Sequence, residues 1–315
     1  MRSFTNSTID AVAQELERLG TEKINPESAE LDSKTSLEIA RTINAEDAKV
    51  AKAVEHALPA IARAIDWIAE SLSNGGRLIY VGAGTSGRLA AMDALECPPT
   101  FDVPPTMVQF VMAGGTTALI KAIEADEDSP SLGAREIRKK KPGKNDVVVG
   151  IAASGRTPFT MGAVEAAKRA GARTIAVTCN RNTPLEKAAG FGIVVETGAE
   201  VIAGSTRLKA GTAQKMVLNM LTSGAMVRMG YVYGNLMVNL DQKNSKLTAR
   251  ALKIVERALK ISKQDARRVL RAASNSVPAA IVMTKAGVSK AEAQRALQAS
   301  RGHARKAIAL ARKMH

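Results

Sequence analysis

Arg77-Leu-Ile-Tyr-Val81 continues into Gly82-Ala-Gly-Thr-Ser-Gly-Arg88, and the same plan returns where Asp146-Val-Val-Val-Gly-Ile151 continues into Ala152-Ala-Ser-Gly-Arg-Thr-Pro158. Each stretch is a short apolar strand that ends at a turn rich in glycine and hydroxyl side chains. The pattern after each turn is that of an amphipathic helix. Backbone N–H groups, hydroxyl groups and the positive end of a helix dipole therefore converge on one small volume. Such a volume predicts a site for a phosphate group.

Either turn alone is equally consistent with an ordinary connection between a strand and a helix. Two copies, whose Ser86 and Ser154 lie 68 residues apart, favour ligand binding, because parallel sheets place ligands at the carboxyl ends of their strands. The spacing Gly82-x-Gly84-x-x-Gly87 fits a dinucleotide fingerprint, but no acidic residue closes the next strand and no Gly-Lys-Ser/Thr occurs. The extra hydroxyl groups favour a compact phosphomonoester over a pyrophosphate.

The rest of the chain predicts an α/β fold with a doubly wound parallel sheet of five strands. Strands are expected at 77–81, 106–111, 146–151, 173–178 and 191–195. The helices between them are expected near 86–95, 115–124, 130–140, 157–170 and 184–189. Before the sheet, a short helix through Ile43 and a longer one from Glu46 to Asn74 are expected. After it, a long helix should run from Lys209 to about Met229, followed by short helices opened by Ser262, Asn275 and Ser289.

Composition places the chain among ordinary globular proteins, with 45% hydrophobic and 24% charged residues in 315. The longest apolar runs have the length of a strand, and the first residues lack an apolar signal core, so we expect a cytoplasmic protein without a membrane partner. Two cysteines, Cys97 and Cys179, and three scattered histidines offer no metal-binding spacing. We therefore expect no metal and no cofactor.

The net charge of +15 is concentrated near the end of the chain, where residues 241–315 hold 18 Lys and Arg against 4 Asp and Glu. A basic helical segment could bind nucleic acid, although a solvated helix face is the commoner meaning of such a run. No aromatic residue follows Tyr233, so this segment has no side chain on which a base could stack. We expect no specific nucleic-acid partner.

Further stretches resemble those of known proteins. The two turns are similar to those of the sugar isomerase (SIS) family, whose flavodoxin-like domains bind phosphosugars. From about residue 22 to the end, the chain resembles the N-acetylmuramic acid 6-phosphate etherase family, and the glucokinase regulatory protein shares several of the same features. The etherase-like stretches are Asp93-Ala-Leu-Glu-Cys-Pro-Pro-Thr100, Glu124-Ala-Asp-Glu-Asp-Ser129 and Gly204-Ser-Thr-Arg-Leu-Lys-Ala-Gly-Thr-Ala-Gln-Lys215.

With this resemblance the chain divides into four expected parts. They are an N-terminal helical segment (1–57), a SIS phosphosugar-binding domain (58–230), connecting helices (231–262) and a C-terminal helical module (263–315) that is similar to ubiquitin-associated folds.

The resemblance implies a lyase that removes D-lactate from N-acetylmuramic acid 6-phosphate and leaves N-acetylglucosamine 6-phosphate, in the recycling of bacterial peptidoglycan. It also implies that the catalytic glutamates are Glu96 and Glu127. We expect Glu96 to be the acid, because a position at a helix end before Pro98-Pro99 would raise its pKa. Glu127 would then be the base. Without the resemblance, each would be interpreted as a surface carboxylate.

For the phosphate group we select Thr85, Ser86, Ser154, Thr157 and the backbone of Gly155. Lys209 ranks first among the cations that could complement the phosphate or the lactyl carboxylate, ahead of Arg88, Arg156 and Arg207. Because related SIS domains commonly pair, we expect a homodimer with the site near the interface. Two other functions remain open: a phosphosugar isomerase, and a sensor that binds a sugar phosphate without catalysis.

Overall fold

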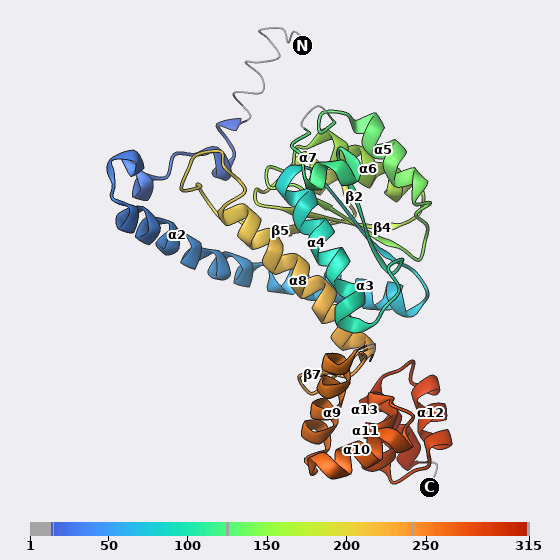
Figure 1. The fold of residues 1–315 in the computed structure, drawn as a ribbon. Coiled ribbons are helices and arrows are strands. Elements are labelled where there is room, and N and C mark those ends of the chain that lie inside the picture. The colour runs from blue at the N-terminus through green and yellow to red at the C-terminus, as the bar shows by residue number, and fades with distance from the viewer. Residues whose placement is uncertain (1–13, 15, 124–125, 241, 243, 314–315) are drawn as a thin grey trace. The chain divides into compact units, whose positions relative to one another are not determined.

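The computed structural model describes residues 14, 16–123, 126–240, 242 and 244–313. Five parallel strands form one sheet in the order β2-β1-β3-β4-β5 (Figure 1). They are β1 (Leu78–Gly82), β2 (Val108–Met112), β3 (Val147–Ile151), β4 (Arg173–Thr178) and β5 (Phe191–Val194). The predicted fold class is confirmed. The order reverses its direction between β1 and β3, and open α/β sheets bind ligands at such a reversal.

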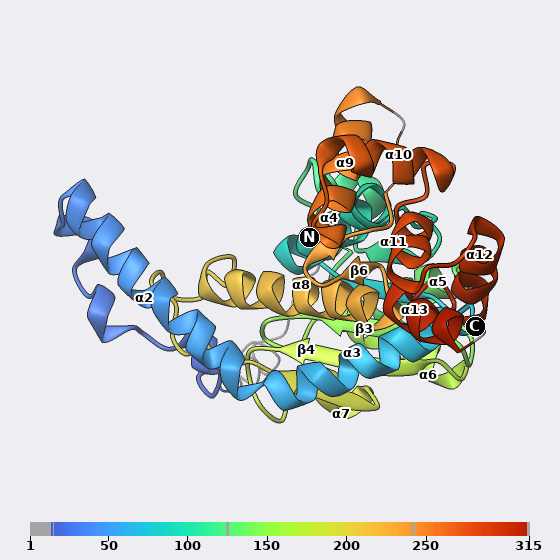
Figure 2. The same ribbon diagram turned by 90° about the horizontal axis from the view of Figure 1, so that it is seen from below.

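Helices cover both faces of the sheet, which is why β1 and β3 are buried at every residue. On one face, Ile79 and Val148 pack in a cluster with Phe159 of α6 (Pro158–Arg169) and Ile137 of α5 (Pro130–Lys139). The opposite face contacts α3 (Leu58–Ser73). Figure 2 shows α3 beside β3, which it contacts. The β-branched strands and the apolar stripes of these helices thus build one layered core.

The N-terminal helices differ from the prediction. One helix, α2 (Ser36–His56), runs through the expected break between Ile43 and Glu46. Its start is fixed by a capping box, in which Thr35 and Glu38 satisfy each other's backbone N–H groups. The break comes instead at Ala57, before α3, because Pro59 has no N–H to continue the hydrogen bonding of α2. From residue 16 onward, three 3₁₀ turns precede α2: η1 (Gly20–Glu22), η2 (Pro26–Ser28) and η3 (Leu31–Ser33).

The helix after the first turn is also longer than predicted. It begins at Gly84 and ends at Phe101, so α4 (Gly84–Phe101) includes Pro98 and Pro99 rather than stopping before them. The N–H of Asp102 donates to the carbonyl of Pro98, which shows that helical hydrogen bonding resumes beyond the prolines. The helix expected at 115–124 is a single 3₁₀ segment, η4 (Gly115–Leu119), and Glu124 lies outside the described residues.

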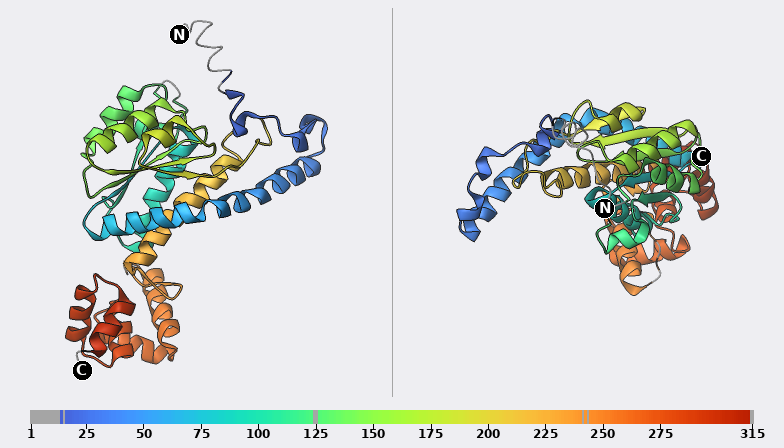
Figure 3. Two further views of the ribbon diagram at one scale, coloured as in Figure 1. Left: turned by 180° about the vertical axis from the view of Figure 1, so that it is seen from behind. Right: turned by 90° about the horizontal axis from the view of Figure 1, so that it is seen from above.

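The chain folds as two compact units: residues 1–94 with 108–221, and residues 95–107 with 222–315. The first unit contains the sheet, α7 (Pro184–Ala188) and most of α8 (Lys209–Met229). In the views of Figures 1 and 3, the loop before α8 lies beside residues 20–28, where the Asn25 side chain donates to the carbonyl of Ala199.

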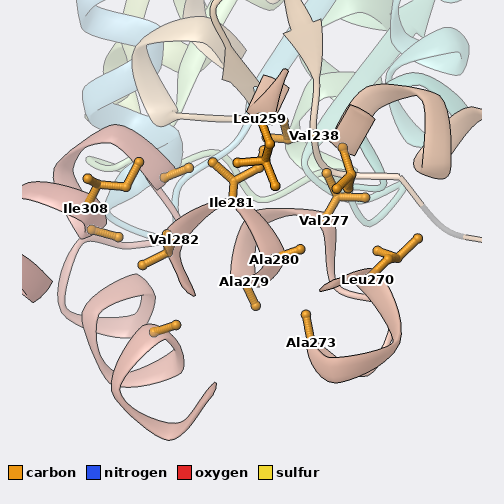
Figure 4. Close-up of a cluster of buried hydrophobic side chains, with 14 of the residues drawn as sticks. Val238, Leu259, Leu270, Ala273, Val277, Ala279, Ala280, Ile281, Val282 and Ile308 are labelled. Carbon is orange, nitrogen blue, oxygen red and sulfur yellow. The ribbon is translucent and has the colours of Figure 1, made fainter. Parts of the chain in front are cut away.

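The second unit is helical apart from a two-stranded ribbon. Besides the ends of α4 and α8, its elements are β6 (Val232–Tyr233), β7 (Leu236–Met237), α9 (Ser245–Leu259), α10 (Lys263–Ala272), α11 (Val277–Ala286), α12 (Lys290–Ala299) and α13 (Ala304–Arg312). Leu259 of α9 shares one core with Ile281 and Ile308, so the expected connecting helices and C-terminal module pack as one body (Figure 4). Ser262 and Ser289 cap their helices as predicted. Ser276 caps α11 in place of Asn275, whose φ of 63° is left-handed.

Candidate phosphosugar site

The two glycine and hydroxyl turns lie at the ends of neighbouring strands. Gly82 is paired in register with Ile151, so β1 and β3 end at the same level of the sheet. Thr85 and Ser86 form the first turn of α4, and Ser154 and Thr157 lie between β3 and α6. All four of these hydroxyl residues are half-buried. The structure therefore brings together the phosphate-site residues that the two separate turns predicted.

The first turn needs glycine because strand and helix approach closely. A Cβ at Gly82 would lie 2.9 Å from the nitrogen of Gly87, and a Cβ at Gly87 would lie 2.8 Å from Met112 Cγ. No real side chain keeps such distances. The glycines thus let the start of α4 fold back against β1, so that the first turn of α4 lies at the edge of the sheet.

In the second turn, the backbone N–H of Gly155, which was expected at the phosphate group, has a partner within the turn. Gly155 has a φ of 67°, and its N–H donates to the carbonyl of Ala152 at 3.0 Å. That N–H is therefore engaged within the turn, and Gly155 contributes its left-handed backbone. The N–H of Arg156 donates to Ser154 Oγ at 3.3 Å. Thr157 occupies the N-cap of α6 without a side-chain capping hydrogen bond, so the helix does not use its hydroxyl group.

Glu127 joins the two turns. Its carbonyl accepts a hydrogen bond of 2.9 Å from the N–H of Phe159, in the first turn of α6. Its carboxylate oxygen Oε1 lies 3.3 Å from the point that a Cβ at Gly84 would occupy. A half-buried carboxylate thus reaches the start of α4, one residue before Thr85 and two before Ser86. A group with this placement can exchange a proton with a ligand that both turns hold.

Glu96 is exposed on α4, twelve residues after Gly84. At a rise of about 1.5 Å per residue, the helix separates these two positions by about 18 Å along its axis. The expected position at a helix end is wrong, because α4 continues for five residues beyond Glu96. The dipole argument for Glu96 as the acid therefore does not apply to this structure.

Lys209 is buried in an ion pair, a position that the sequence did not predict. Its Nζ lies 2.6 Å from Glu46 Oε2 of α2, and both side chains are 3% exposed. Lys49 also binds the Glu46 carboxylate. Burial raises the pKa of Glu46, but hydrogen bonds from Lys209 and Lys49 lower it by more, so that the pKa falls from 4.5 to about 2. In this structure Lys209 holds α2 against the start of α8.

A second carboxylate completes the start of α8. Both oxygens of buried Glu200 accept hydrogen bonds of 2.9 Å, one from the N–H of Lys209 and one from the N–H of Ala210. Burial raises the pKa of Glu200, and the two backbone donors act in the opposite direction. The positive end of the α8 dipole is therefore capped from inside the protein.

Gln214 is the residue that sequence reasoning missed. Ser86 Oγ donates to Gln214 Oε1 at 2.9 Å, and Gln214 is 1% exposed. A Cβ at Gly211 would lie 3.6 Å from Thr85 Cγ2, so the first turns of α8 pack on the first turn of α4. Gln214 could have been selected as a candidate because it is a polar residue in Gly204–Lys215, one of the stretches that resemble the etherase family. Among the arginines considered, Arg88 donates to the carbonyl of Lys121 and Arg207 is exposed.

The described ranges offer neither a metal centre nor a membrane span. No cluster of three His, Cys, Asp or Glu side chains that could hold a metal ion occurs in them. None of the helices in those ranges combines the length and the apolar character that crossing a bilayer requires. Cys97 and Cys179 are both buried. Burial raises the pKa of the Cys179 thiol to about 12, so it is a poor nucleophile.

Two family models match the part of the chain that carries these turns. A model described as the glucokinase regulatory protein N-terminal SIS domain matches residues 60–168, and a SIS domain model matches residues 140–224. Among solved structures, a phosphoheptose isomerase from Francisella tularensis is 20% identical, with a TM-score of 0.49 over 61% of this chain and 98% of its own.

Curated relatives named N-acetylmuramic acid 6-phosphate etherase match almost the whole chain. The Vibrio vulnificus protein is 48% identical over 93% of this chain and 98% of its own length. The Clostridium botulinum protein is 48% identical over 93% and 97%, and the Streptomyces coelicolor protein is 49% identical over 94% and 96%. This chain belongs to the N-acetylmuramic acid 6-phosphate etherase family.

Proposed function

We propose that this protein cleaves the lactyl ether of N-acetylmuramic acid 6-phosphate and releases D-lactate and N-acetylglucosamine 6-phosphate. The observation that carries the proposal is the 48% identity, over 93% of the chain, to relatives that bear this name. The two adjacent turns support it, because they offer hydroxyl groups and a helix start to one phosphate group. We further propose that the enzyme acts in the cytoplasm in peptidoglycan recycling.

The chemistry follows from the acidity of carbon next to a carbonyl group. In the ring-opened sugar, the C2 hydrogen is alpha to the aldehyde and the lactyl oxygen is attached to C3. A base removes the C2 proton, the electron pair forms the C2–C3 double bond, and lactate leaves C3 with a proton from an acid. Water then adds to C3 and a proton returns to C2. One base and one acid are therefore required on either side of one bond.

We assign the base to Glu127 and the acid to Glu96. Glu127 is supported by its half-buried carboxylate beside Gly84, at the start of the helix that carries Ser86. A phosphate group held by both turns would keep the sugar chain within reach of that carboxylate. For Glu96 the support is the resemblance of its surroundings, Leu95-Glu96-Cys97-Pro98-Pro99, to the family.

We propose a homodimer with a shared site, because the SIS domains that this chain resembles commonly pair. Glu127 lies beside the first residue of α4, and Glu96 lies twelve residues later in the same helix, whereas the reacting carbons of the sugar are bonded neighbours. We propose that the partner subunit supplies Glu96 to the site that contains Glu127. In a symmetric dimer this exchange occurs in both sites.

Release of D-lactate from N-acetylmuramic acid 6-phosphate tests the function directly. The variants Glu127→Gln and Glu96→Gln should each lose most activity, while Glu165→Gln, an exposed carboxylate of α6, should retain it. In deuterated water, exchange at C2 should survive in Glu96→Gln and stop in Glu127→Gln. Exchange that survives only in Glu127→Gln would reverse the two roles.

Mixing the two inactive variants tests the shared site. After subunit exchange, a heterodimer has one site with both glutamates intact, so an equal mixture should recover about a quarter of the wild-type activity. No recovery, with exchange demonstrated by mass spectrometry, would contradict the shared site. Folded wild-type protein that leaves the lactyl ether intact would contradict the etherase, and phosphosugar isomerisation or binding without turnover would then identify which alternative holds.

A further inference from the structure

Gln214, a buried residue of α8, contacts the Ser86 hydroxyl group, which we propose binds the phosphate group of the ligand. The Ser86–Gln214 hydrogen bond joins residues that are 128 positions apart in sequence. The Gln214 amide nitrogen, Nε2, is buried as well, and within the described part of the chain it has no hydrogen-bond partner. A buried donor without an acceptor is destabilising, because it has lost its hydrogen bond to water and gained none in the protein, so its presence at this position requires a reason.

The contact also conflicts with phosphate binding. A serine hydroxyl group has a single hydrogen, and Ser86 directs it at Gln214 Oε1. The oxygens of a phosphate dianion can only accept hydrogen bonds. While Ser86 donates to the glutamine, it has no hydrogen left for the phosphate. Binding therefore requires the hydroxyl group to turn away from Gln214.

Rotation of the Gln214 amide by 180° resolves both difficulties. It exchanges Oε1 and Nε2, so that Nε2 donates to Ser86 Oγ and the Ser86 hydrogen can point at a phosphate oxygen. The terminal amide torsion is soft, and a buried carbonyl oxygen tolerates the lack of a partner better than a buried N–H does. The resulting chain from amide to hydroxyl to phosphate would polarise the last hydrogen bond.

We propose that Gln214 is a positioning residue, which orients the Ser86 hydroxyl group toward the phosphate of the ligand by donating to Ser86 Oγ. The start of α8 is fixed at Lys209, five residues before Gln214. There Glu46 pairs with the Lys209 side chain, and Glu200 accepts a hydrogen bond from the Lys209 N–H. The inference rests on the proposed function only in requiring that a phosphosugar binds at Ser86.

Calorimetric titration of the full chain with N-acetylglucosamine 6-phosphate tests the proposal without turnover. Gln214→Leu removes both polar atoms. Gln214→Glu, once its carboxyl group is ionised, accepts from Ser86 but cannot donate, and because burial raises the pKa of that group the titrations are run at pH 7, 8 and 9. We expect each to raise the Kd about tenfold, the size of one hydrogen bond to a charged group, with the larger loss for Gln214→Glu. Thr222→Val, at a second buried polar residue of α8, is the control and should bind as the wild type does.

The loss of affinity caused by the Gln214 substitutions must also depend on Ser86. In a Ser86→Ala background, Gln214→Leu should cause no further loss of affinity, because the hydroxyl group it orients is absent. In lactate-release assays the single variants should raise KM about tenfold and leave kcat within about twofold, as expected for a contact made equally in ground and transition states. Circular dichroism selects folded variants, and Gln214→Met replaces Gln214→Leu if the latter does not fold.

Three results would overturn the proposal: Gln214→Glu binding as tightly as wild type, equal losses with and without the Ser86 hydroxyl group, or a loss confined to kcat. Failure of the etherase function is distinguishable. A protein that releases no lactate, but binds N-acetylglucosamine 6-phosphate with the expected dependence on Gln214 and Ser86, retains the inference and loses the proposed reaction.

Discussion

The buried pair between Glu46 and Lys209 makes stability depend on pH, and Glu46→Gln is the variant that reveals it. The Glu46 pKa falls from 4.5 to about 2 in the folded protein. A carboxylate with a lowered pKa stabilises the fold above its unfolded pKa, and this contribution is lost as the pH falls toward the folded value. The relevant window therefore lies between pH 4.5 and about pH 2.

The magnitude follows from the same two values. The lowering corresponds to about 3 kcal/mol at pH 7. Water close to the exposed Lys49, whose side chain is 60% accessible, screens part of this. We therefore expect Glu46→Gln to lower the free energy of unfolding by about 2–3 kcal/mol at pH 7 and by no more than about 1.5 kcal/mol at pH 3.

Urea denaturation at pH 7, 5, 4 and 3 measures this difference, with Glu55→Gln as the control because Glu55 is an exposed carboxylate of the same helix. The double variant Glu46→Leu with Lys209→Met should recover most of the loss, since replacing both members of a buried pair costs less than leaving one charge alone. If Glu46→Gln matches Glu55→Gln at every pH, the buried pair does not stabilise the fold and the reasoning is refuted.

Two further predictions concern residues around the sheet. Gly155→Ala should lower the free energy of unfolding by at least about 1–2 kcal/mol and raise KM, because its φ of 67° is strained for alanine and its Cβ would lie 2.4 Å from Thr183 Cβ; a fully stable, active variant in urea denaturation and lactate assays would count against this. Iodoacetamide at pH 8 should leave the native Cys179 unlabelled by mass spectrometry and label it in denaturant, since a pKa of about 12 leaves almost no thiolate; fast labelling of the folded protein would contradict the buried environment.

Local patterns in the chain were sufficient for much of the fold. The apolar strands at 147–151 and 173–178 lie where alternation with helices predicts them, and N-caps such as Ser262 and Ser289 begin the helices that they were expected to begin. The helix boundaries at prolines were less predictable. Pro59 ends α2, whereas Pro98 and Pro99 lie inside α4, although all three lack the same N–H.

The turns that form the candidate site could also be predicted from local sequence patterns. Gly82, Gly87 and Gly155 are required by a close approach or by a left-handed backbone, and hydroxyl residues beside them are a local signal. Glu127 could be identified only by resemblance, because nothing in an acidic loop reveals which carboxylate will meet Gly84. Its position depends on the hydrogen bond from Phe159, 32 residues later in the chain.

The parallel α/β class, the two turns rich in glycine and hydroxyl residues, and the family could be recognised from the sequence, because each depends on residues that are neighbours in the chain. Tertiary structure alone decided that Lys209 pairs with Glu46 and that Gln214 meets Ser86, contacts that span 163 and 128 residues. The sequence around a lysine at the start of a helix does not show which group its side chain will contact. Whether it faces a ligand or a buried carboxylate is decided by the packing of α2 against α8, since a buried charge is stable only beside a partner that the fold delivers.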